Sequence, residues 1–156
     1  MGKIDINQLK KIREVTGAGV VDCQRALAES DGDEARALTW LREKGLQSAS
    51  KKAEREVESG LVWSYTHAEG RILAVVELAC ETDFVARTDE FKQLANELAM
   101  QVAAMAPLTV DELLAQPYIR DESKKTGDLV TGLVAKLGEN ILVRRVARFE
   151  LGEEIA

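Results

Sequence analysis

The spacing of apolar residues changes along this chain, and that change limits the possible folds more than any other feature. Between residues 5 and 45 apolar residues recur every three or four positions, as in amphipathic helices. From Leu61 onward, two short apolar runs flank a loop that contains glycine, as in a β-hairpin. The sequence therefore predicts an α+β fold, with a three-helix module first and then a small antiparallel sheet packed with helices.

Residues 1–45 contain the signals of three short helices. Asp5 is placed to cap the first helix, with Gln8 reaching back to close a capping box. A tight connection begins at Gly17, a turn with a new N-cap follows at residues 31–33, and Gly45 is expected to end the third helix. The apolar stripes of the three helices are Leu9, Ile12 and Val15, then Val20, Cys23 and Leu27, then Ala37, Leu38 and Leu41. A bundle of this size buries too little surface to be very stable alone.

A charged segment separates this module from the rest of the chain. Over residues 46–59, good helix formers carry alternating charge and few apolar side chains. We expect a solvated helical linker here, and Gly60 is expected to break it. The predicted domains are a helical module over 1–45, the linker over 46–59, and an α+β core and dimerisation domain over 60–156.

The second half combines strands with helices. Residues 61–66 and 72–79 are predicted to form a β-hairpin around the loop His67–Gly70. One apolar face then runs over more than three helical turns after Thr88, so a long helix is expected to cover the sheet. The members of this face are Phe91, Leu94, Ala95, Leu98, Val102 and Met105.

The last third is predicted to contain two further helices and a closing strand. A capping box at Thr109 starts a short helix, and a less regular helix is expected over 123–137 with Gly138 at its end. The closing strand covers 140–150, where apolar and mostly polar residues alternate. The residues expected on its apolar face are Ile141, Val143, Ala147 and Phe149.

Charge and cysteine content exclude several classes of function. The chain has 21 Lys and Arg against 27 Asp and Glu, a net charge of -6 that repels a nucleic-acid backbone. No apolar stretch approaches the roughly 20 residues that span a bilayer, and the start is polar rather than a signal peptide. Cys23 and Cys80 have no further ligand near them at metal-binding spacing. We therefore expect a cytoplasmic protein with reduced, mostly buried thiols and no nucleic-acid, membrane or metal contact.

The sequence also lacks the patterns of an enzyme or a nucleotide site. Residues 17–22 have two of the three glycines of a dinucleotide fingerprint, but a helix rather than a strand precedes them. A Gly-Lys-Ser or Gly-Lys-Thr loop is missing, so the chain is not expected to hold GTP. His67 is the single histidine, without a nucleophile or acid at a spacing that predicts contact. We expect no catalytic residue, no cofactor and no enzymatic activity.

The segment Cys80–Arg87 does not fit a purely structural role. Asp83 stands beside the aromatic Phe84 at a predicted turn from strand to helix. In such a turn Phe84 either projects outward to a partner or folds back onto the core. The residues themselves leave both positions open.

Three motifs together resemble the elongation factor Ts family in their order and spacing. They are Thr16-Gly17-Ala18-Gly19-Val20-Val21-Asp22-Cys23, Thr82-Asp83-Phe84-Val85-Ala86-Arg87, and Gly138-Glu139-Asn140-Ile141 with Arg144-Arg145-Val146. The resemblance runs over almost the whole chain. It implies a ubiquitin-associated-like helical module, a linker and an α+β core. It also implies a role in bacterial translation, as guanine-nucleotide exchange factor for the GTPase elongation factor Tu.

The resemblance further implies where the partner is contacted. Members of the family bind elongation factor Tu in its GDP-bound and nucleotide-free states, loosen magnesium and GDP, and leave when GTP binds. The segment implied to enter the GTPase near its magnesium site is Thr82, Asp83, Phe84 and Val85. The residues implied to contact its nucleotide domain are Arg13, Val20 and Val21. Many members have two methionines in place of these valines, and valine is shorter and stiffer, so this contact is expected to differ in detail.

The chain is short for this family. Longer members carry a second core half and a C-terminal helical module, and residues 107–138 are too few to hold either. Some short members form homodimers that restore a larger core surface, and the closing strand 140–150 has the exposed-edge character that strand pairing needs. We therefore expect a homodimer. The alternative function is an adaptor, whose helical module binds ubiquitin-like or other helical partners while the core is a scaffold.

Overall fold

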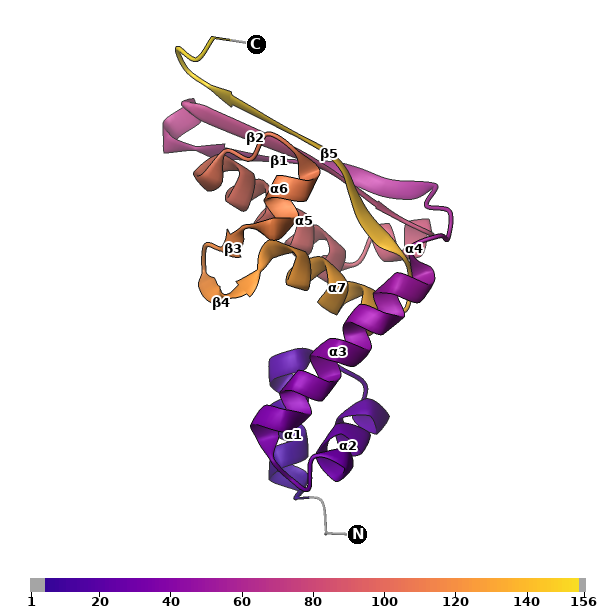
Figure 1. Cartoon of the computed structure of the whole chain (residues 1–156). Coiled ribbons are helices and arrows are strands. Elements are labelled where there is room, and N and C mark those ends of the chain that lie inside the picture. Colours follow the sequence, from indigo (N-terminus) through magenta and orange to yellow (C-terminus); the bar gives the residue numbers. More distant parts are fainter. Residues whose placement is uncertain (1–4, 155–156) are drawn as a thin grey trace.

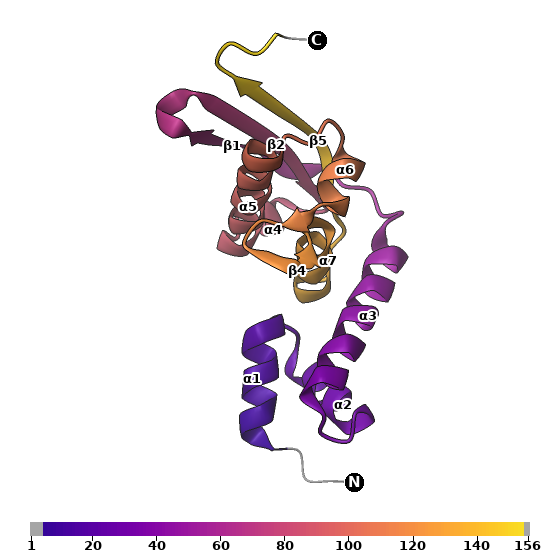
Figure 2. The ribbon, with the colours of Figure 1, turned by 60° about the vertical axis from the view of Figure 1, so that its left-hand side comes forward.

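The computed structural model describes residues 5–154, which form a helical module joined by one long helix to a larger α+β core (Figures 1 and 2). The helices are α1 (Ile6–Thr16), α2 (Val20–Glu29), α3 (Glu34–Lys52), the 3-10 turn η1 (Ala68–Gly70), α4 (Asp83–Ala86), α5 (Asp89–Met105), α6 (Val110–Ala115) and α7 (Thr126–Leu137). The strands are β1 (Ser59–His67), β2 (Ile72–Cys80), β3 (Pro117–Tyr118), β4 (Asp121–Lys125) and β5 (Ile141–Glu150). The predicted α+β class is confirmed.

The three helices of the module begin where their caps predict. Asp5 caps α1 by accepting a hydrogen bond from the N–H of Asn7 at 2.9 Å, and Asp33 caps α3 by accepting from Arg36 at 3.0 Å. The shared core of the module consists of Ile12, Cys23, Ala26, Leu27, Ala37 and Leu41. The module therefore has a hydrophobic core of its own, separate from that of the sheet domain.

Two details of the module differ from the sequence prediction. Gln8 does not close a capping box, because its side-chain amide donates to the carbonyl of Gly32 at 3.3 Å and so ties α1 to the turn before α3. Val15 and Val20 are exposed, although their spacing assigns them to the apolar stripes. A core this small has room for the centre of each stripe, and its margins remain in water.

The third helix is longer than its sequence signals predict. α3 continues through Gly45 and ends at Lys52, so the predicted end at Gly45 is wrong. Gly45 is buried, and a Cβ at this position would lie 3.7 Å from the Cβ of Ala135 in α7. The helix therefore continues through this glycine, which is buried where α7 packs against α3. The predicted linker consists of the last two turns of α3, an irregular segment and the first residue of β1, and its Ala49 packs against the main core.

The predicted hairpin is confirmed, and it forms two strands of an antiparallel sheet in the order β1-β2-β5. Gly60 does not break the chain before the hairpin, since it lies within β1 and pairs with Ala79. Its φ is 150°, and a Cβ there would overlap the carbonyl oxygen of Leu78 and lie 2.8 Å from the Cα of Ala79. The close approach of the two strands is the reason for a glycine at this place.

The closing strand forms, but the two halves of β5 turn different residues to the core. The register shifts between Glu77 and Leu78 of β2, and Arg144 is the extra residue of a β-bulge. The apolar residues before the bulge, Ile141 and Val143, are buried, and those after it, Ala147 and Phe149, are exposed. The prediction of one shared apolar face is wrong because a single extra residue reverses which side chains point inward.

Helices cover one face of this sheet, as predicted. α5 lies across β1 and β2, with the predicted stripe buried apart from Met105 (Figure 2). α7 packs against both α5 and α3, and Gly138 ends it as predicted. The helix predicted over 123–137 begins only at Thr126, because the preceding residues form the small hairpin β3–β4. This hairpin is largely charged and has no alternation of apolar residues that would reveal it.

Both cysteines are buried free thiols, as predicted. Burial raises the pKa of Cys80 to about 11, and the nearby carboxylate of Glu139 adds to this effect. Cys80 therefore remains a neutral thiol at physiological pH. Among the helices of residues 5–154, none is both long and apolar enough to cross a membrane.

Candidate functional site

The strongest candidate site is the tip turn, residues 82–87, which leads from β2 to α5 and contains α4. Thr82 is the N-cap of α4, and its hydroxyl accepts a hydrogen bond from the N–H of Val85 at 3.4 Å. At the other end, the hydroxyl of Thr88 donates to the carbonyl of Val85 at 2.8 Å and caps α5. Two threonine hydroxyls therefore fix this turn where it leaves the sheet and where it enters the long helix.

Phe84 projects from the tip turn into solvent. It is 79% exposed, whereas phenylalanine is normally among the most buried residues of a protein. Of the two positions that the sequence leaves open, the structure has the outward one. Beside it, Asp83 forms an ion pair with Arg87 at 2.8 Å. An exposed aromatic side chain flanked by charges is typical of an interaction surface.

The four residues of the predicted segment have different surroundings. Asp83 and Phe84 are exposed, Val85 packs against the main core, and Thr82 is half-buried. Asp83 and Phe84 thus make the outer surface of the turn. Thr82 and Val85 connect that surface to the protein beneath it.

Sequence reasoning missed the loop that holds the tip turn. The carboxylate of Glu139, between α7 and β5, accepts hydrogen bonds from the hydroxyl and the N–H of Thr82 at 2.6 and 3.1 Å. In return, Glu81 accepts from the N–H of Asn140 at 2.6 Å. Glu139 and Asn140 do belong to one of the three family-like motifs, but their partners lie 57 and 59 positions away. Neighbouring residues in the sequence give no sign of these bonds.

The same loop controls the ionisation of Glu81. The hydrogen bond from Asn140 lowers the pKa of Glu81, and Arg55, 3.4 Å away, acts in the same direction against the opposing effect of burial. Glu81 is therefore held as a carboxylate next to the tip turn.

The second predicted contact lies where α1 meets α2. Arg13 is in the last turn of α1, while Val20 and Val21 begin α2 and are 41% and 73% exposed. Val15 in α1, which the sequence assigns to the interior, is also exposed. An exposed valine pair beside a cation is the kind of surface that a protein partner can cover.

The end of α7 connects the two predicted contacts. Lys136, in its last turn, reaches Gly17 in the α1–α2 connection, where its Cδ lies 3.3 Å from the position a Cβ would take. It also pairs with Glu90 at the start of α5, at 3.4 Å. Three residues further on, Glu139 holds Thr82. The C-terminal end of α7, with the loop that follows it, therefore contacts both the α1–α2 connection and the tip turn. The sequence gives no sign that Lys136 makes the first of these contacts.

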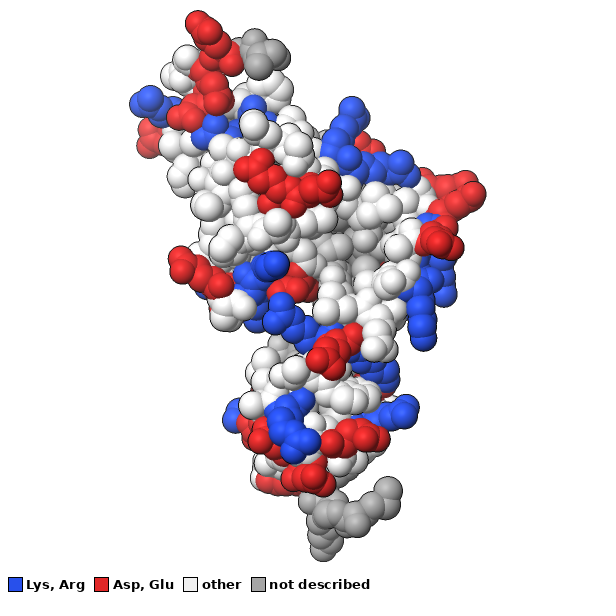
Figure 3. All heavy atoms as spheres, in the orientation of Figure 1, with Lys and Arg blue, Asp and Glu red and all other residues white. Residues whose placement is uncertain are grey.

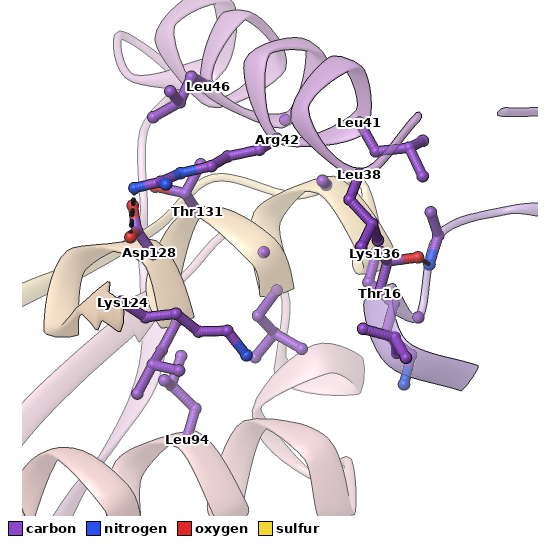
Figure 4. Close-up of a pocket in the computed structure, with 18 of the residues that line it drawn as sticks. Thr16, Leu38, Leu41, Arg42, Leu46, Leu94, Lys124, Asp128, Thr131 and Lys136 are labelled. Atoms are coloured by element: carbon purple, nitrogen blue, oxygen red, sulfur yellow. Dashed lines mark hydrogen bonds and ion pairs between the residues drawn. The ribbon is translucent and has the colours of Figure 1, made fainter. Parts of the chain in front are cut away.

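A cleft of about 820 Å³ opens between α3, α7 and the end of α1 (Figure 4). Arg42 of α3 crosses it to Asp128 of α7 at 2.7 Å. The other cations of its lining are paired too: Lys44 with Asp22, Arg120 with Glu97, Lys124 with Asp121 and Lys136 with Glu90. Cations that already have carboxylate partners attract a phosphate group weakly. We therefore interpret the cleft as the gap between module and core, not as a nucleotide pocket.

Acidic and basic side chains are interspersed over the face shown in Figure 3. This mixture fits the modest negative net charge of the chain. Proteins that bind nucleic acid through one face usually concentrate lysine and arginine on it. The visible face lacks such a concentration. Within residues 5–154, no group of three or more His, Cys, Asp or Glu side chains is arranged to hold a metal ion.

Comparison with known proteins gives one consistent result. The family model described as Elongation factor TS matches residues 81–156. A relative named Elongation factor Ts from Oleidesulfovibrio alaskensis is 42% identical over 197 residues, which cover 97% of this chain and 100% of the relative. Relatives of the same name from Thermotoga neapolitana and Rippkaea orientalis are 42% and 41% identical, covering 97% and 99% of this chain and 99% and 81% of their own lengths. These alignments are longer than the 156 residues of the chain, so the relatives contain segments that it lacks.

Proposed function

This chain belongs to the elongation factor Ts family, and on that premise we propose that it is the guanine-nucleotide exchange factor of the GTPase elongation factor Tu. It acts during polypeptide elongation and binds the GTPase in both its GDP-bound and nucleotide-free states. Exchange follows from linkage, because a factor that binds the nucleotide-free GTPase more tightly must weaken nucleotide binding by the same ratio. The mechanism therefore requires no catalytic residue and no cofactor.

The observation that carries this proposal is the exposure of Phe84 on the tip turn. In the complex, Thr82, Asp83, Phe84 and Val85 are the segment directed at the magnesium site of the GTPase. Magnesium bridges the nucleotide phosphates and protein oxygens, so a wedge that displaces its supporting side chains removes a large stabilisation of bound GDP. Phe84 is the wedge and Asp83 competes for polar partners. Thr82 and Val85 hold the turn from which these two project.

The helical module supplies the second contact in this proposal. Arg13, Val20 and Val21 dock on the nucleotide domain of the GTPase, and their exposure supports that role. We retain the division into module, linker and core over 1–45, 46–59 and 60–156 as part of the proposal. Because α3 is continuous across the first boundary, module and core are presented to the GTPase through one helix.

A second copy of this chain is the other partner that we propose. Within residues 5–154, β5 is an edge strand of the sheet, with β2 on one side and an unpaired edge on the other. On the outer face of the sheet, Leu73 and Phe149 form a cross-strand pair and are 38% and 51% exposed. An apolar pair next to an open edge favours association of two sheets, which would enlarge the small core surface of one chain.

An adaptor is the alternative function. The exposed valines at positions 15, 20 and 21 of the helical module also suit a helical or ubiquitin-like partner, with the core as a scaffold. An adaptor whose core is only a scaffold gives no reason for an exposed phenylalanine on the tip turn of that core. We therefore favour the exchange factor.

Release of a fluorescent GDP from elongation factor Tu tests the proposal. We expect the purified chain to accelerate release in a concentration-dependent way, and not to bind GDP itself in calorimetry. An adaptor leaves the dissociation of GDP unchanged, and that result would contradict the exchange function.

A further inference from the structure

The loop between α7 and β5 and the tip turn are joined by reciprocal hydrogen bonds. Glu139 accepts from the hydroxyl of Thr82 at 2.6 Å and from its N–H at 3.1 Å, while Glu81 accepts from the N–H of Asn140 at 2.6 Å. Two of these bonds go from backbone N–H groups to carboxylates, which are among the stronger hydrogen bonds in proteins. The exchange function described above assigns no part to Glu139.

The bonds of Glu139 converge on the residue that starts α4. A threonine hydroxyl has one proton and two lone pairs. In this structure its proton goes to Glu139, which leaves a lone pair for the N–H of Val85. α4 has four residues, too few to be stable as an isolated helix. The direction of Phe84 therefore depends on the cap at Thr82, and that cap depends on Glu139.

We propose that Glu139 is a positioning residue for nucleotide exchange, which orients Thr82 so that Phe84 is presented in one direction. This inference rests on the proposed function. Glu139 is half-buried behind the turn and acts through Thr82, not by touching the nucleotide. A wedge that is already ordered loses less conformational freedom when it enters the partner, so more of its contact energy remains for displacing magnesium.

Asn140 connects the same loop to the helical module. It is 4% exposed, and its side-chain amide donates to the carbonyls of Ala53 and Arg55 at 3.3 and 2.8 Å, just beyond the end of α3. One loop therefore holds both the tip turn and the end of the helix that carries the module. This arrangement fixes the wedge relative to the second docking surface.

A kinetic comparison tests the role of Glu139. We expect Glu139→Ala to lower the maximal rate of GDP release on the order of tenfold, because Thr82 loses the carboxylate that accepts both of its hydrogen bonds. The concentration of factor that gives half of that rate should remain within about twofold, because the module still docks. Thr82→Val should lower the maximal rate of GDP release as much as Glu139→Ala does, and the double variant should lower it no further than either single variant.

Glu122→Ala is the matched control, since Glu122 is an exposed glutamate outside the site.

Hydrogen exchange of the chain alone gives a readout that does not depend on the partner. In Glu139→Ala the amides of residues 82–88 should exchange faster, while those of β2 and the middle of α5 remain unchanged. Faster exchange throughout the core would mean that Glu139 supports the whole domain, and would overturn the positioning role. An unchanged maximal rate in Glu139→Ala would also overturn it. A wild-type chain without any effect on GDP release contradicts the proposed function itself, and the two failures are therefore distinguishable.

Discussion

Phe84 and Phe91 lie seven positions apart in the sequence but in opposite surroundings. Phe84 is 79% exposed, and Phe91, in the first turn of α5, is fully buried. We predict that Phe84→Ala changes the free energy of unfolding by no more than roughly 0.5 kcal/mol. GDP release should slow on the order of 30-fold, because a desolvated hot spot contributes about 2 kcal/mol or more. Thermal melts and release rates, measured on the same preparations, check both parts.

Phe91→Ala is the control for this experiment. Truncation of a buried phenylalanine costs about 3 to 5 kcal/mol, so this variant should melt at a markedly lower temperature. Asp83→Ala should act like Phe84→Ala but more weakly, because an exposed polar contact contributes little. Undiminished exchange per folded molecule in Phe84→Ala would refute the wedge.

Glu81 makes the stability of the fold sensitive to acid. Its pKa is lowered in the folded chain from an ordinary value of 4.5, chiefly by the hydrogen bond from Asn140. The stabilisation of the fold by the Glu81 carboxylate is therefore fully present above about pH 4.5, and it is lost as the pH falls through the pKa of the folded state. We predict that Glu81→Gln is less stable than the wild type at pH 7, and that the difference narrows below about pH 4.5. Urea unfolding at pH 7 and pH 3.5 measures the difference in the free energy of unfolding between the two proteins. The same difference at both pH values would refute the stabilising role of the Glu81 carboxylate.

At the scale of elements, the seam between α3 and α7 decides how the module sits on the core. A Cβ at Gly45 meets Ala135 at 3.7 Å, an ordinary contact distance. Alanine is also the better helix former, so Gly45→Ala should raise the free energy of unfolding by about 0.5 to 1 kcal/mol. Gly45→Leu should lower it, because the larger side chain pushes the two helices apart. Urea unfolding curves of both variants check the direction.

Gly60→Ala is the matched control for this pair. The same change in β1 places a Cβ on the carbonyl oxygen of Leu78 at a φ of 150°, so it should destabilise the fold by more than about 1 kcal/mol. Equal effects of alanine at positions 45 and 60 would contradict the described packing of α3 on α7.

The bulge in β5 has a consequence for the linker as well as for the strand. Arg144, the extra residue, donates to the carbonyl of Val57 at 2.5 Å, and so secures the irregular segment between α3 and β1. On the far side of the bulge, Arg148 is inside and donates to the carbonyl of Ala103 at the end of α5. The polar residues of this strand therefore join elements that the apolar pattern leaves unconnected.

For the whole molecule, the proposed dimer makes the sharpest prediction. If two copies associate through β5 and the adjoining sheet face, sedimentation equilibrium should give a mass above that of one chain. Phe149→Asp should lower this mass, because it introduces a charge into an apolar contact. Val21→Asp, in the helical module, is the control and should leave it unchanged. A dimer that tolerates Phe149→Asp would have to use another surface.

Local signals in the sequence determined most of the elements of this protein. Helix caps at Asp5 and Asp33, the apolar runs on either side of the hairpin loop and the stripe that begins at Phe91 depend on residues within a few positions of one another, and all are observed. Family membership is likewise a property of the sequence, and the comparisons confirm it. The contact residues carried over from that family remain predictions.

Tertiary structure decided the features that depend on distant partners. The sequence around Gly45 favours a helix end, but contact with α7 more than 80 positions away keeps α3 continuous. The face of Phe149 depends on pairing with β2, and the orientation of Thr82 depends on Glu139. Phe84 projects outward from a turn that is anchored through Thr82, which bonds to Glu139, and Val85, which packs on the core. Such contacts arise only when the chain has folded, so no short window of sequence specifies them.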